Sequence, residues 1–498
     1  MASLLTPTAL WAAFLSLLIL LVLRRLHRLK NAGLLNLPPG PPGWPIVGNL
    51  FQVAFSGKHF IHYVRDLCRA HGPVFTLRMG ARTLIVVSGA DLAHEALIEQ
   101  GPLFASRPVE SPTRSLFSSR QFTVNSAPYG PTWRSLRRNM VSGALGPAPL
   151  RIFQPILDWA WVDSWTKSRR SPMHHPLMGP LPGFVAMWAS LFSILLSMTF
   201  SFVFDNDEIL RVDGIMKRVL LPISPRMDDY LPLLHPFFAR RRAEALAVRR
   251  EQIEALIPLI NRHSLIDLRI EGHNNAPPTN DELVSLCSEF INGGTDTSAT
   301  VVEWAMARII ESPTIQARLY EDIAANVGKN WPLLRKHPLT HFVLSHAVSA
   351  NSAHPAQLSG YDIPTDASVE KDYFIKKSSE DPKLWTQPVE FNPDRFLTDE
   401  ESADLTGSRE IRMTPFGAGT RICPRLALDI THIGLIVTRI VQAFKWQSHP
   451  LQPDLNFKDD QFEFTVVMKR LLLAMVRPRN MNKVQRLSSP SSPPYQIF

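Results

Sequence analysis

The stretch Pro415-Phe416-Gly417-Ala418-Gly419-Thr420-Arg421-Ile422-Cys423 is the most informative part of this 498-residue sequence. It is a glycine-rich loop that ends in a cysteine, with an arginine two residues before that cysteine. Loop N–H groups and a nearby positive charge stabilise a thiolate relative to a thiol. A buried structural cysteine usually lies in an apolar helix or strand instead. We therefore predict that Cys423 is poised to be a thiolate.

The chemistry open to Cys423 is limited by what the sequence lacks. The only other cysteines are Cys68 and Cys287, far apart in the chain, which excludes a disulfide framework and favours a reducing compartment. No CxxC or HExxH motif accompanies Cys423, which argues against zinc. The fragment Gly417-Ala418-Gly419 lacks the third glycine of a dinucleotide site. One thiolate as the sole protein ligand fits haem iron.

Upstream of this loop, the longest helical pattern covers Asn280–Glu311. Thr279 and Glu282 predict a capping box at its start, and Ser312-Pro313 predicts its end. Its middle reads Asn292-Gly293-Gly294-Thr295-Asp296-Thr297-Ser298, although each glycine inside a helix costs about 1 kcal/mol relative to alanine. Two interpretations stay open, a locally opened helix with freed carbonyls and a polar pocket, or a glycine pair used for close packing.

The N-terminus predicts a membrane anchor. Residues 1–23 carry no charge, and a helix of that length spans about 34 Å, enough to cross the hydrocarbon core. Arg24, Arg25, Arg28 and Lys30 follow the apolar run, whereas a cleavable signal peptide would have its charges first. A buried N-terminal helix is the alternative. The positive-inside rule predicts a single-pass protein whose body is cytoplasmic.

The remaining chain predicts one large helical body. Forty-five per cent hydrophobic and 19% charged residues exclude a mostly disordered chain. The +9 charge is scattered among acids and no nucleic-acid motif is present, so nucleic-acid binding is not expected. Runs 75–79 and 83–87 predict a hairpin, 237–257 predicts a helix, and the uncharged run 184–204 is either a core helix or a second membrane span. We favour the core helix.

These features together predict the domain organisation. Residues 1–30 are the anchor with its basic flank, and residues 31–48, rich in proline, form a semi-rigid hinge. The catalytic domain covers 49–480, and 481–498 is a disordered tail. The predicted fold class is mainly α, with small β-sheets and an N-terminal transmembrane helix.

In this order, the motifs resemble those of a microsomal cytochrome P450 of plant type, a haem-thiolate monooxygenase. The resemblance covers nearly the whole chain and rests on the anchor, the hinge and four further segments. These are Trp133-Arg134-Ser135-Leu136-Arg137, the Gly293-to-Ser298 segment, Phe391-Asn392-Pro393-Asp394-Arg395-Phe396 and the loop from Phe416 to Cys423.

The resemblance implies a site built around haem b. Cys423 would be the axial ligand, in the loop that begins at Phe416, and Trp133, Arg137 and Arg421 would contact the haem propionates. Asp296 and Thr297 would deliver protons for oxygen activation, and Gly293 and Gly294 would leave room for the oxygen. Electrons would come from NADPH through an NADPH-cytochrome reductase docked on the basic proximal face, at the endoplasmic reticulum membrane.

A narrower resemblance concerns the substrate. Segments 104–108 (FASRP), 122–125 (FTVN), 129–131 (YGP) and 228–232 (DDYLP) are similar to plant enzymes that act on fatty acids. This similarity implies a hydrophobic small-molecule substrate and in-chain hydroxylation or epoxidation.

Three features depart from the family pattern. Pro332 replaces the glutamate of the Glu-x-x-Arg pair that ends at Arg335, the stretch before Pro332 is short, and Arg425 replaces a glycine two residues after Cys423. The alternative to an active monooxygenase is therefore a non-catalytic relative or a wrongly assembled coding sequence. An unpaired buried Arg335 would cost about 3–5 kcal/mol, and we expect poor haem incorporation from it. Sequencing the transcript across codons 327–335 distinguishes the alternatives.

Overall fold

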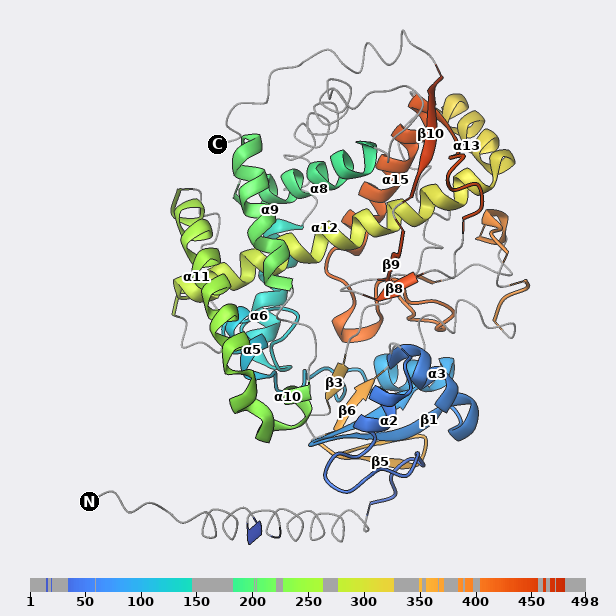
Figure 1. The fold of residues 1–498 in the computed structure, drawn as a ribbon. Helices are drawn as coiled ribbons and strands as arrows, with labels where there is room; N and C mark the ends of the chain where they lie inside the picture. Colours follow the sequence, from blue (N-terminus) through green and yellow to red (C-terminus); the bar gives the residue numbers. More distant parts are fainter. Residues whose placement is uncertain are drawn as a thin grey trace. The chain divides into compact units, whose positions relative to one another are not determined.

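The two β-type runs form the hairpin that the sequence predicts. In the computed structural model, β1 (Val74–Met79) and β2 (Arg82–Val87) pair antiparallel, with Val74 opposite Val87. Gly80 in the turn has φ +57°, and a Cβ there would lie 2.2 Å from the Tyr230 carbonyl oxygen, so only glycine fits. β6 (Ala367–Glu370) joins β2 in parallel and β3 (Ser349–Asn351) joins β6, giving the sheet order β1-β2-β6-β3 (Figure 1).

The structure describes most of the globular part of the chain. The described residues are 35–58, 60–145, 182–200, 204–220, 227–262, 276–326, 349–351, 355–365, 367–370, 384–387, 390–396, 404–455, 460–462, 466–470 and 472–479, with 15, 16, 19 and 202 alone. Nearly all of the predicted anchor, the departure at Pro332 and Arg335, and the predicted tail lie outside these residues. Those predictions, like the domain boundaries, stay predictions.

The chain divides into two compact units. Unit 1 comprises Met1–Pro108, Pro225–Phe238 and Val348–Phe374, and unit 2 comprises Val109–Ser224, Ala239–Ala347 and Ile375–Phe498. Besides the sheet, unit 1 contains α2 (Leu50–Phe55), α3 (Phe60–His71), α4 (Ala90–His94), the π-helical turn Glu95–Glu99, α10 (Met227–Tyr230), the 3-10 turn Pro232–Phe238, and the hairpin of β4 (Ala356–Leu358) and β5 (Tyr361–Ile363).

Both faces of the unit 1 sheet are buried. Phe75 and Leu77 lie in a cluster with α2 and α3, whereas Ile85 and Val87 lie in a second cluster with β4 and β5. This is why eight of the twelve residues of β1 and β2 are apolar, without strict alternation.

The proline-rich segment is held against this sheet. The Thr76 backbone N–H donates to the Pro39 carbonyl and its hydroxyl donates to the Pro38 carbonyl, each at 2.8 Å. The Asn36 backbone N–H donates to Asp362 on β5 at 2.8 Å. Proline has no N–H to donate, but its carbonyl accepts normally, so residues 36–39 are tied to unit 1.

Unit 2 is a helical body around one long central helix, α12 (Asn280–Glu311), seen crossing the middle of Figure 1. α12 contacts α8, α11, α13, α15, β7 and β9. The elements are α5 (Pro112–Phe117), α6 (Pro131–Asn139), the π-helical turn Met140–Ala144, α8 (Pro182–Phe200), α9 (Asn206–Leu220), α11 (Ala239–Arg262), α13 (Pro313–Asn326), the 3-10 turns Pro393–Phe396 and Gly419–Arg421, α15 (Leu426–Ala443), β7 (Phe444–Ser448) paired with β10 (Ala474–Pro478), and β8 (Asp460–Phe462) paired with β9 (Val466–Met468).

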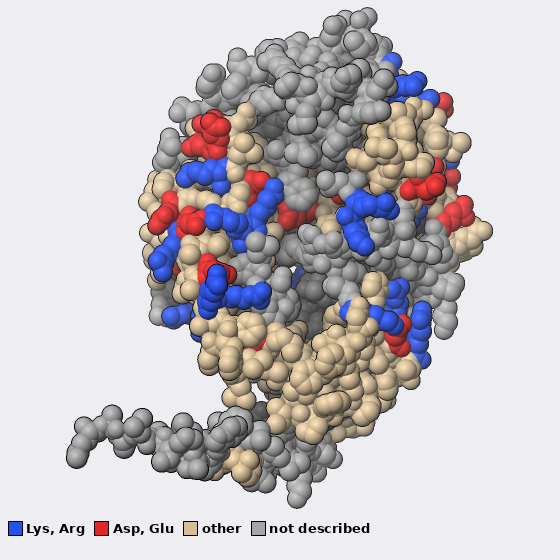
Figure 2. Space-filling model, viewed as in Figure 1, with Lys and Arg blue, Asp and Glu red and all other residues tan. Residues whose placement is uncertain are grey.

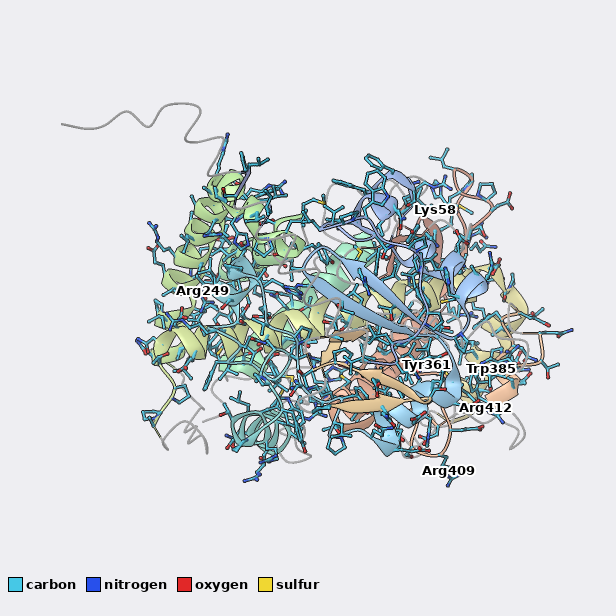
Figure 3. All side chains as sticks on the ribbon, turned by 90° about the horizontal axis from the view of Figure 1, so that it is seen from below. Lys58, Arg249, Tyr361, Trp385, Arg409 and Arg412 are labelled. Carbon is cyan, nitrogen blue, oxygen red and sulfur yellow. The ribbon has the colours of Figure 1, made fainter. Side chains whose placement is uncertain are left out.

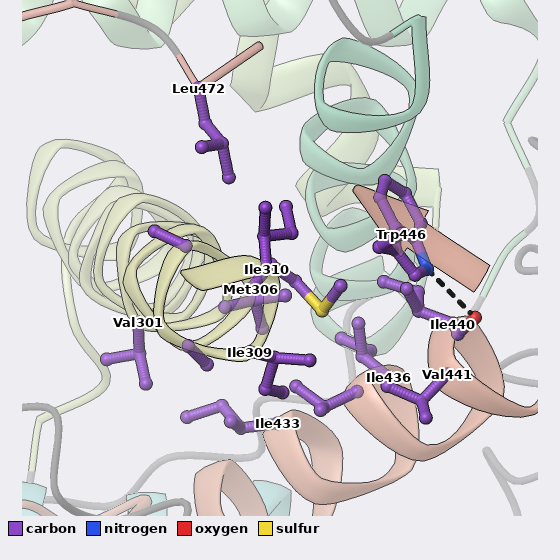
Figure 4. Packing of buried hydrophobic residues seen from close by; sticks show 14 of the residues in the cluster. Val301, Met306, Ile309, Ile310, Ile433, Ile436, Ile440, Val441, Trp446 and Leu472 are labelled. Atoms are coloured by element: carbon purple, nitrogen blue, oxygen red, sulfur yellow. Dashed lines mark hydrogen bonds between the residues drawn. The ribbon is translucent and has the colours of Figure 1, made fainter. Parts of the chain in front are cut away.

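The packing of α12 explains the uncharged runs. Leu191–Phe200 of α8 is buried against α12, which confirms that the run 184–204 contains a core helix. Met306 and Ile309 of α12 pack against Ile433 and Ile436 of α15 in one apolar cluster (Figure 4). Among the described residues, α15 alone is long and apolar enough to cross a membrane, and half of it is buried. The fold is mainly α with small sheets, as predicted.

Candidate functional site

The glycine-rich loop holds Cys423 by backbone hydrogen bonds. Gly417 and Gly419 have φ of +72° and +70°, a region that favours glycine. The Cys423 N–H donates to the Phe416 carbonyl at 2.8 Å, and the Ile422 N–H donates to the Gly419 carbonyl at 3.0 Å. Phe416 therefore contributes its backbone to the loop geometry, and its side chain is partly buried.

Burial dominates the protonation of this cysteine. It raises the pKa of the Cys423 thiol to about 11, and the neighbouring Asp429 carboxylate raises it further. The Arg425 backbone N–H, which donates to the sulfur, and the Arg425 and Arg137 charges oppose this rise without overcoming it. The protein groups by themselves thus favour the thiol, and the thiolate at Cys423 stays a prediction. A bound metal cation deprotonates a coordinating thiol.

Helix α6 brings two of the predicted haem-contacting residues to the loop. Arg137 donates to the Ile422 carbonyl at 2.5 Å, next to Cys423. The Arg421 guanidinium carbon lies 4.7 Å from the centre of the Trp133 ring, within cation–π distance. Trp133, Arg137 and Arg421 thus come together, although Arg421 lies 284 residues after Arg137 in the sequence.

The donors of this cluster already have backbone partners. Trp133 Nε1 and Arg421 Nη1 both donate to the Val124 carbonyl at 2.9 Å. Trp133 has one N–H, which is donated to Val124 here, and its contact with a haem propionate stays a prediction. A guanidinium has five N–H donors, so Arg137 and Arg421 can hold a carboxylate beside these bonds.

Glu289 on α12 is a member of this cluster that the sequence analysis missed. Its carboxylate accepts the Val124 N–H at 2.8 Å and the Asn125 N–H at 2.5 Å. Burial raises its pKa, while these N–H groups and the charge of Arg421 act in the opposite direction. An acid inside the apolar run from Leu286 to Ile291 is the sequence signal that could have found it.

The pair Gly293-Gly294 in α12, the glycine step, was open to two interpretations, and the structure answers each of them. α12 is continuous from Asn280 to Glu311, so of the two interpretations the locally opened helix is wrong. The Thr295 and Thr297 hydroxyls donate to the Ile291 and Gly293 carbonyls, each at 2.9 Å, as threonine commonly does inside helices. Gly293 is exposed in an otherwise buried helix, and a Cβ on it would meet nothing within 4 Å.

The second glycine of this step is a packing position. A Cβ on Gly294 would lie 1.2 Å from Nη1 of Arg425, two residues after Cys423. Asp296 and Thr297 lie on the next turn, Asp296 partly buried and Thr297 only 7% exposed. The structure therefore brings Gly293, Asp296 and Thr297 together, with open space at Gly293 alone.

The Phe391–Phe396 motif forms its own buried support. Arg395 is 4% exposed and donates to the Gln387 and Glu390 carbonyls at 3.0 and 3.2 Å. Its guanidinium lies 5.8 Å from the centre of the Trp385 ring. The predicted partner of this arginine falls on residues that the structure does not describe.

The residues present fit a haem group in three respects. Cys423 offers a single sulfur, Arg137 and Arg421 offer guanidinium groups for carboxylates, and a Cβ on Gly293 of α12 would meet nothing within 4 Å. No group of three or more His, Cys, Asp or Glu side chains that could hold a metal ion occurs among the described residues. A lone thiol is the donor set expected for haem iron and not for zinc.

Comparisons with known proteins agree with this donor set. A family model described as Cytochrome P450 matches residues 38–475. Cytochrome P450 89A9 of Arabidopsis thaliana is 30% identical, over 89% of this chain and 94% of its own length. Trans-cinnamate 4-monooxygenase of Oryza sativa subsp. japonica is 27% identical, over 82% of this chain and 87% of its own length.

Solved structures agree on the fold. A zebra fish cytochrome P450 structure with progesterone has a TM-score of 0.67 and 22% identity, and it covers 85% of this chain and 100% of its own. At that identity the likeness shows the fold alone. With the family match over most of the sequence, it follows that the chain belongs to the cytochrome P450 family and is a plant-type haem monooxygenase.

Proposed function

We propose that Cys423 is the axial ligand of a haem b and that the protein hydroxylates or epoxidises a fatty acid at an in-chain position. The observation that carries the proposal is that two guanidinium groups lie beside Cys423. Arg137 donates to the Ile422 carbonyl, and Arg421, two residues before Cys423, lies over the Trp133 ring. When bound, the haem supplies oxygen activation, with electrons that come from NADPH through a reductase.

The chain's own residues orient the group and supply protons. Arg137 and Arg421 hold its carboxylates, since guanidinium forks match carboxylate geometry. The open face of Gly293 leaves room for a small molecule beside Thr297. The Thr297 hydroxyl, with Asp296 on the same turn, supplies a proton at its Oγ1 atom.

The substrate proposal rests on the similarity of four segments to fatty-acid enzymes. Two of them, 122–125 and 129–131, flank the Trp133 cluster, where Phe122, Val124 and Tyr129 pack. Relatives with other printed names include a trans-cinnamate 4-monooxygenase and a pluviatolide synthase. Spectral titration with long-chain fatty acids and with cinnamate distinguishes the two acid classes, and a response to cinnamate alone would contradict the proposal.

We place the protein on the endoplasmic reticulum membrane with an NADPH-cytochrome reductase as its partner. The net charge of +9 suits an acidic partner. On the face shown in Figure 2, Lys and Arg lie beside Asp and Glu over α9 and α11, so the surface of these two helices mixes both signs of charge.

The test of the proposal is Cys423→Ser. We expect the variant to lose the thiolate-type Soret band of the reduced carbon monoxide complex, because a serine hydroxyl cannot replace the sulfur donor. The matched control is Cys287→Ser, which changes a thiol buried in α12 whose pKa burial raises to about 12. An unchanged band in Cys423→Ser would show that another group holds the iron.

A further inference from the structure

Arg425 is a buried charge beside the cysteine. It is 5% exposed and stands at the N-cap of α15, two residues after Cys423. Its guanidinium reaches across to α12, where Nη1 and Nη2 lie 1.2 and 2.8 Å from the position of a Cβ on Gly294. Its carbon lies 5.4 Å from the centre of the Phe290 ring, one turn earlier on α12.

The guanidinium is only partly satisfied where it lies. Nη2 is paired with Asp429 at 3.2 Å, and both side chains are almost fully buried. Nε and Nη1 have no hydrogen-bond partner among the residues that the structure describes. A buried donor without an acceptor is costly, and more so when it is charged.

Within the described part of the chain, Asp429 is the acid paired with the Arg425 charge, and this acid has a second partner. Asp429 is shared with the Ser298 hydroxyl at 3.5 Å, and burial raises the pKa of its carboxyl. Burial and the charge of Arg425 together lower the pKa of His432 to about 3, so this histidine is neutral. The described partners of the Arg425 charge are therefore Asp429 and the Phe290 ring.

Gly294 and Arg425 fit each other as a pair. Any side chain at position 294 would collide with the guanidinium, whereas the neighbouring Gly293 meets nothing. The family resemblance implies that Gly294 leaves room for oxygen. In the structure, the side chain of Arg425, at the N-cap of α15, occupies the space beside Gly294.

A haem in the proposed site would need the same space beside Gly294 that the Arg425 guanidinium occupies. A haem held by Cys423, with room for oxygen at Gly293, would need the space between the cysteine loop and α12. Arg425 is the side chain that spans from the cysteine loop to that helix.

We propose that Arg425 competes with haem for the face of Gly294, so that the guanidinium has to leave this face before haem bound to Cys423 can lie against α12. The inference rests on the proposed function of Cys423. Its consequence is that Arg425 lowers the affinity of the chain for haem and that glycine at this position raises it.

The experiment measures haem per polypeptide and the carbon monoxide spectrum of the purified full-length chain, not turnover. Arg425→Gly removes the guanidinium, and glycine is well tolerated at a helix N-cap. Because Asp429 then loses its cation, Arg425→Gly with Asp429→Asn is made as a second variant. Arg425→Lys keeps a long cationic side chain. Arg439→Ala, which removes an arginine about four turns further along α15, is the matched control.

We expect both glycine variants to carry at least threefold more haem than the wild type, with a thiolate-type band, while Arg425→Lys and Arg439→Ala stay at the wild-type level. Equal haem content in the wild type and both glycine variants overturns the competition, whatever that content is. Cys423→Ser in the Arg425→Gly background tests the ligand proposal separately, because this double variant should lose the thiolate-type band if Cys423 is the ligand. If the thiolate-type band is equal in the wild type and the glycine variants, only the competition fails. If no variant with Cys423 shows the band, both proposals fail.

Discussion

At the scale of single residues, Thr297 and Thr295 show how position decides the use of one side chain. Both hydroxyls donate to the carbonyl four residues earlier, at 2.9 Å. Thr297 adjoins the open Gly293, whereas Thr295 is 2% exposed on another face of α12. A hydroxyl that donates can still accept through its lone pairs, so only Thr297 can pass a proton to a molecule beside Gly293.

This difference predicts the outcome of Thr297→Ala. We expect normal haem content but several-fold less product per NADPH, with the missing electrons recovered as hydrogen peroxide, because proton delivery at Oγ1 is lost. Thr295→Ala, which removes the same kind of hydroxyl, serves as the control and keeps its coupling. Wild-type coupling in Thr297→Ala would exclude the proton role.

Residue identity also marks the limit of what the sequence predicts. The ends of α12 were predictable because the capping box of Thr279 and Glu282 and the Pro313 stop act locally, and both are present. The occupant of Gly294 was not, because it depends on how α15 meets α12. Glu289 was missed for the same reason, since its partners at 124 and 125 are distant in sequence.

At the scale of elements, the first half of α12 is fixed by buried polar bonds. Arg249 of α11, labelled in Figure 3, donates to Asp281 Oδ1 at 2.7 Å and to the Ser285 hydroxyl at 2.8 Å. Three turns of α12 are thus tied to α11 and, through Glu289, to the segment before α6. This fixes the helix that carries Gly293 and Thr297 before any ligand is considered.

The pKa of Glu289 predicts a pH dependence. Because burial raises this pKa above its ordinary 4.5, the folded chain keeps a proton that the unfolded chain releases. The free energy of unfolding therefore falls as pH rises from 4.5 to the folded pKa, and is constant above it. Glu289→Gln does not titrate and lacks this fall.

The measurement is the thermal unfolding midpoint of both proteins between pH 4.5 and 8. We expect the midpoint of the wild type relative to Glu289→Gln to decrease with rising pH and then to level off. Glu321→Gln removes an exposed carboxylate of α13 and controls for the loss of one charge. A constant difference across the range would mean that Glu289 is ionised throughout.

At the scale of the whole molecule, the site residues all belong to unit 2, although they come from segments 122–137, 289–297 and 416–429. Their order along the chain, together with the cysteine loop, was enough to predict the family and the fold class. The sequence could not predict that Trp133 and Arg421 donate to the carbonyls of Val124 and Ala127, because no motif specifies which donor meets which carbonyl.

The N-terminal segment yields a prediction for the intact protein. Deletion of residues 1–30 should release most of the protein from microsomes into the supernatant, because it removes the uncharged run 1–23. Deletion of 481–498 is the matched control and should leave the distribution unchanged. Full-length protein that is already soluble without detergent would contradict the anchor.

The hydrogen bonds from Thr76 to the Pro38 and Pro39 carbonyls limit how far the sheet of unit 1 can lie from the predicted anchor. Among the described residues, Asn36 is the first that is hydrogen-bonded to the β5 strand of unit 1, through Asp362. Only six peptide units separate Asn36 from Lys30. Fully stretched, six residues reach about 20 Å. A bilayer-embedded 1–30 would therefore keep the edge of unit 1 near β5 within that radius of the lipid surface, so lengthening the 31–35 stretch would loosen the protein's orientation on the membrane without changing a single contact inside it.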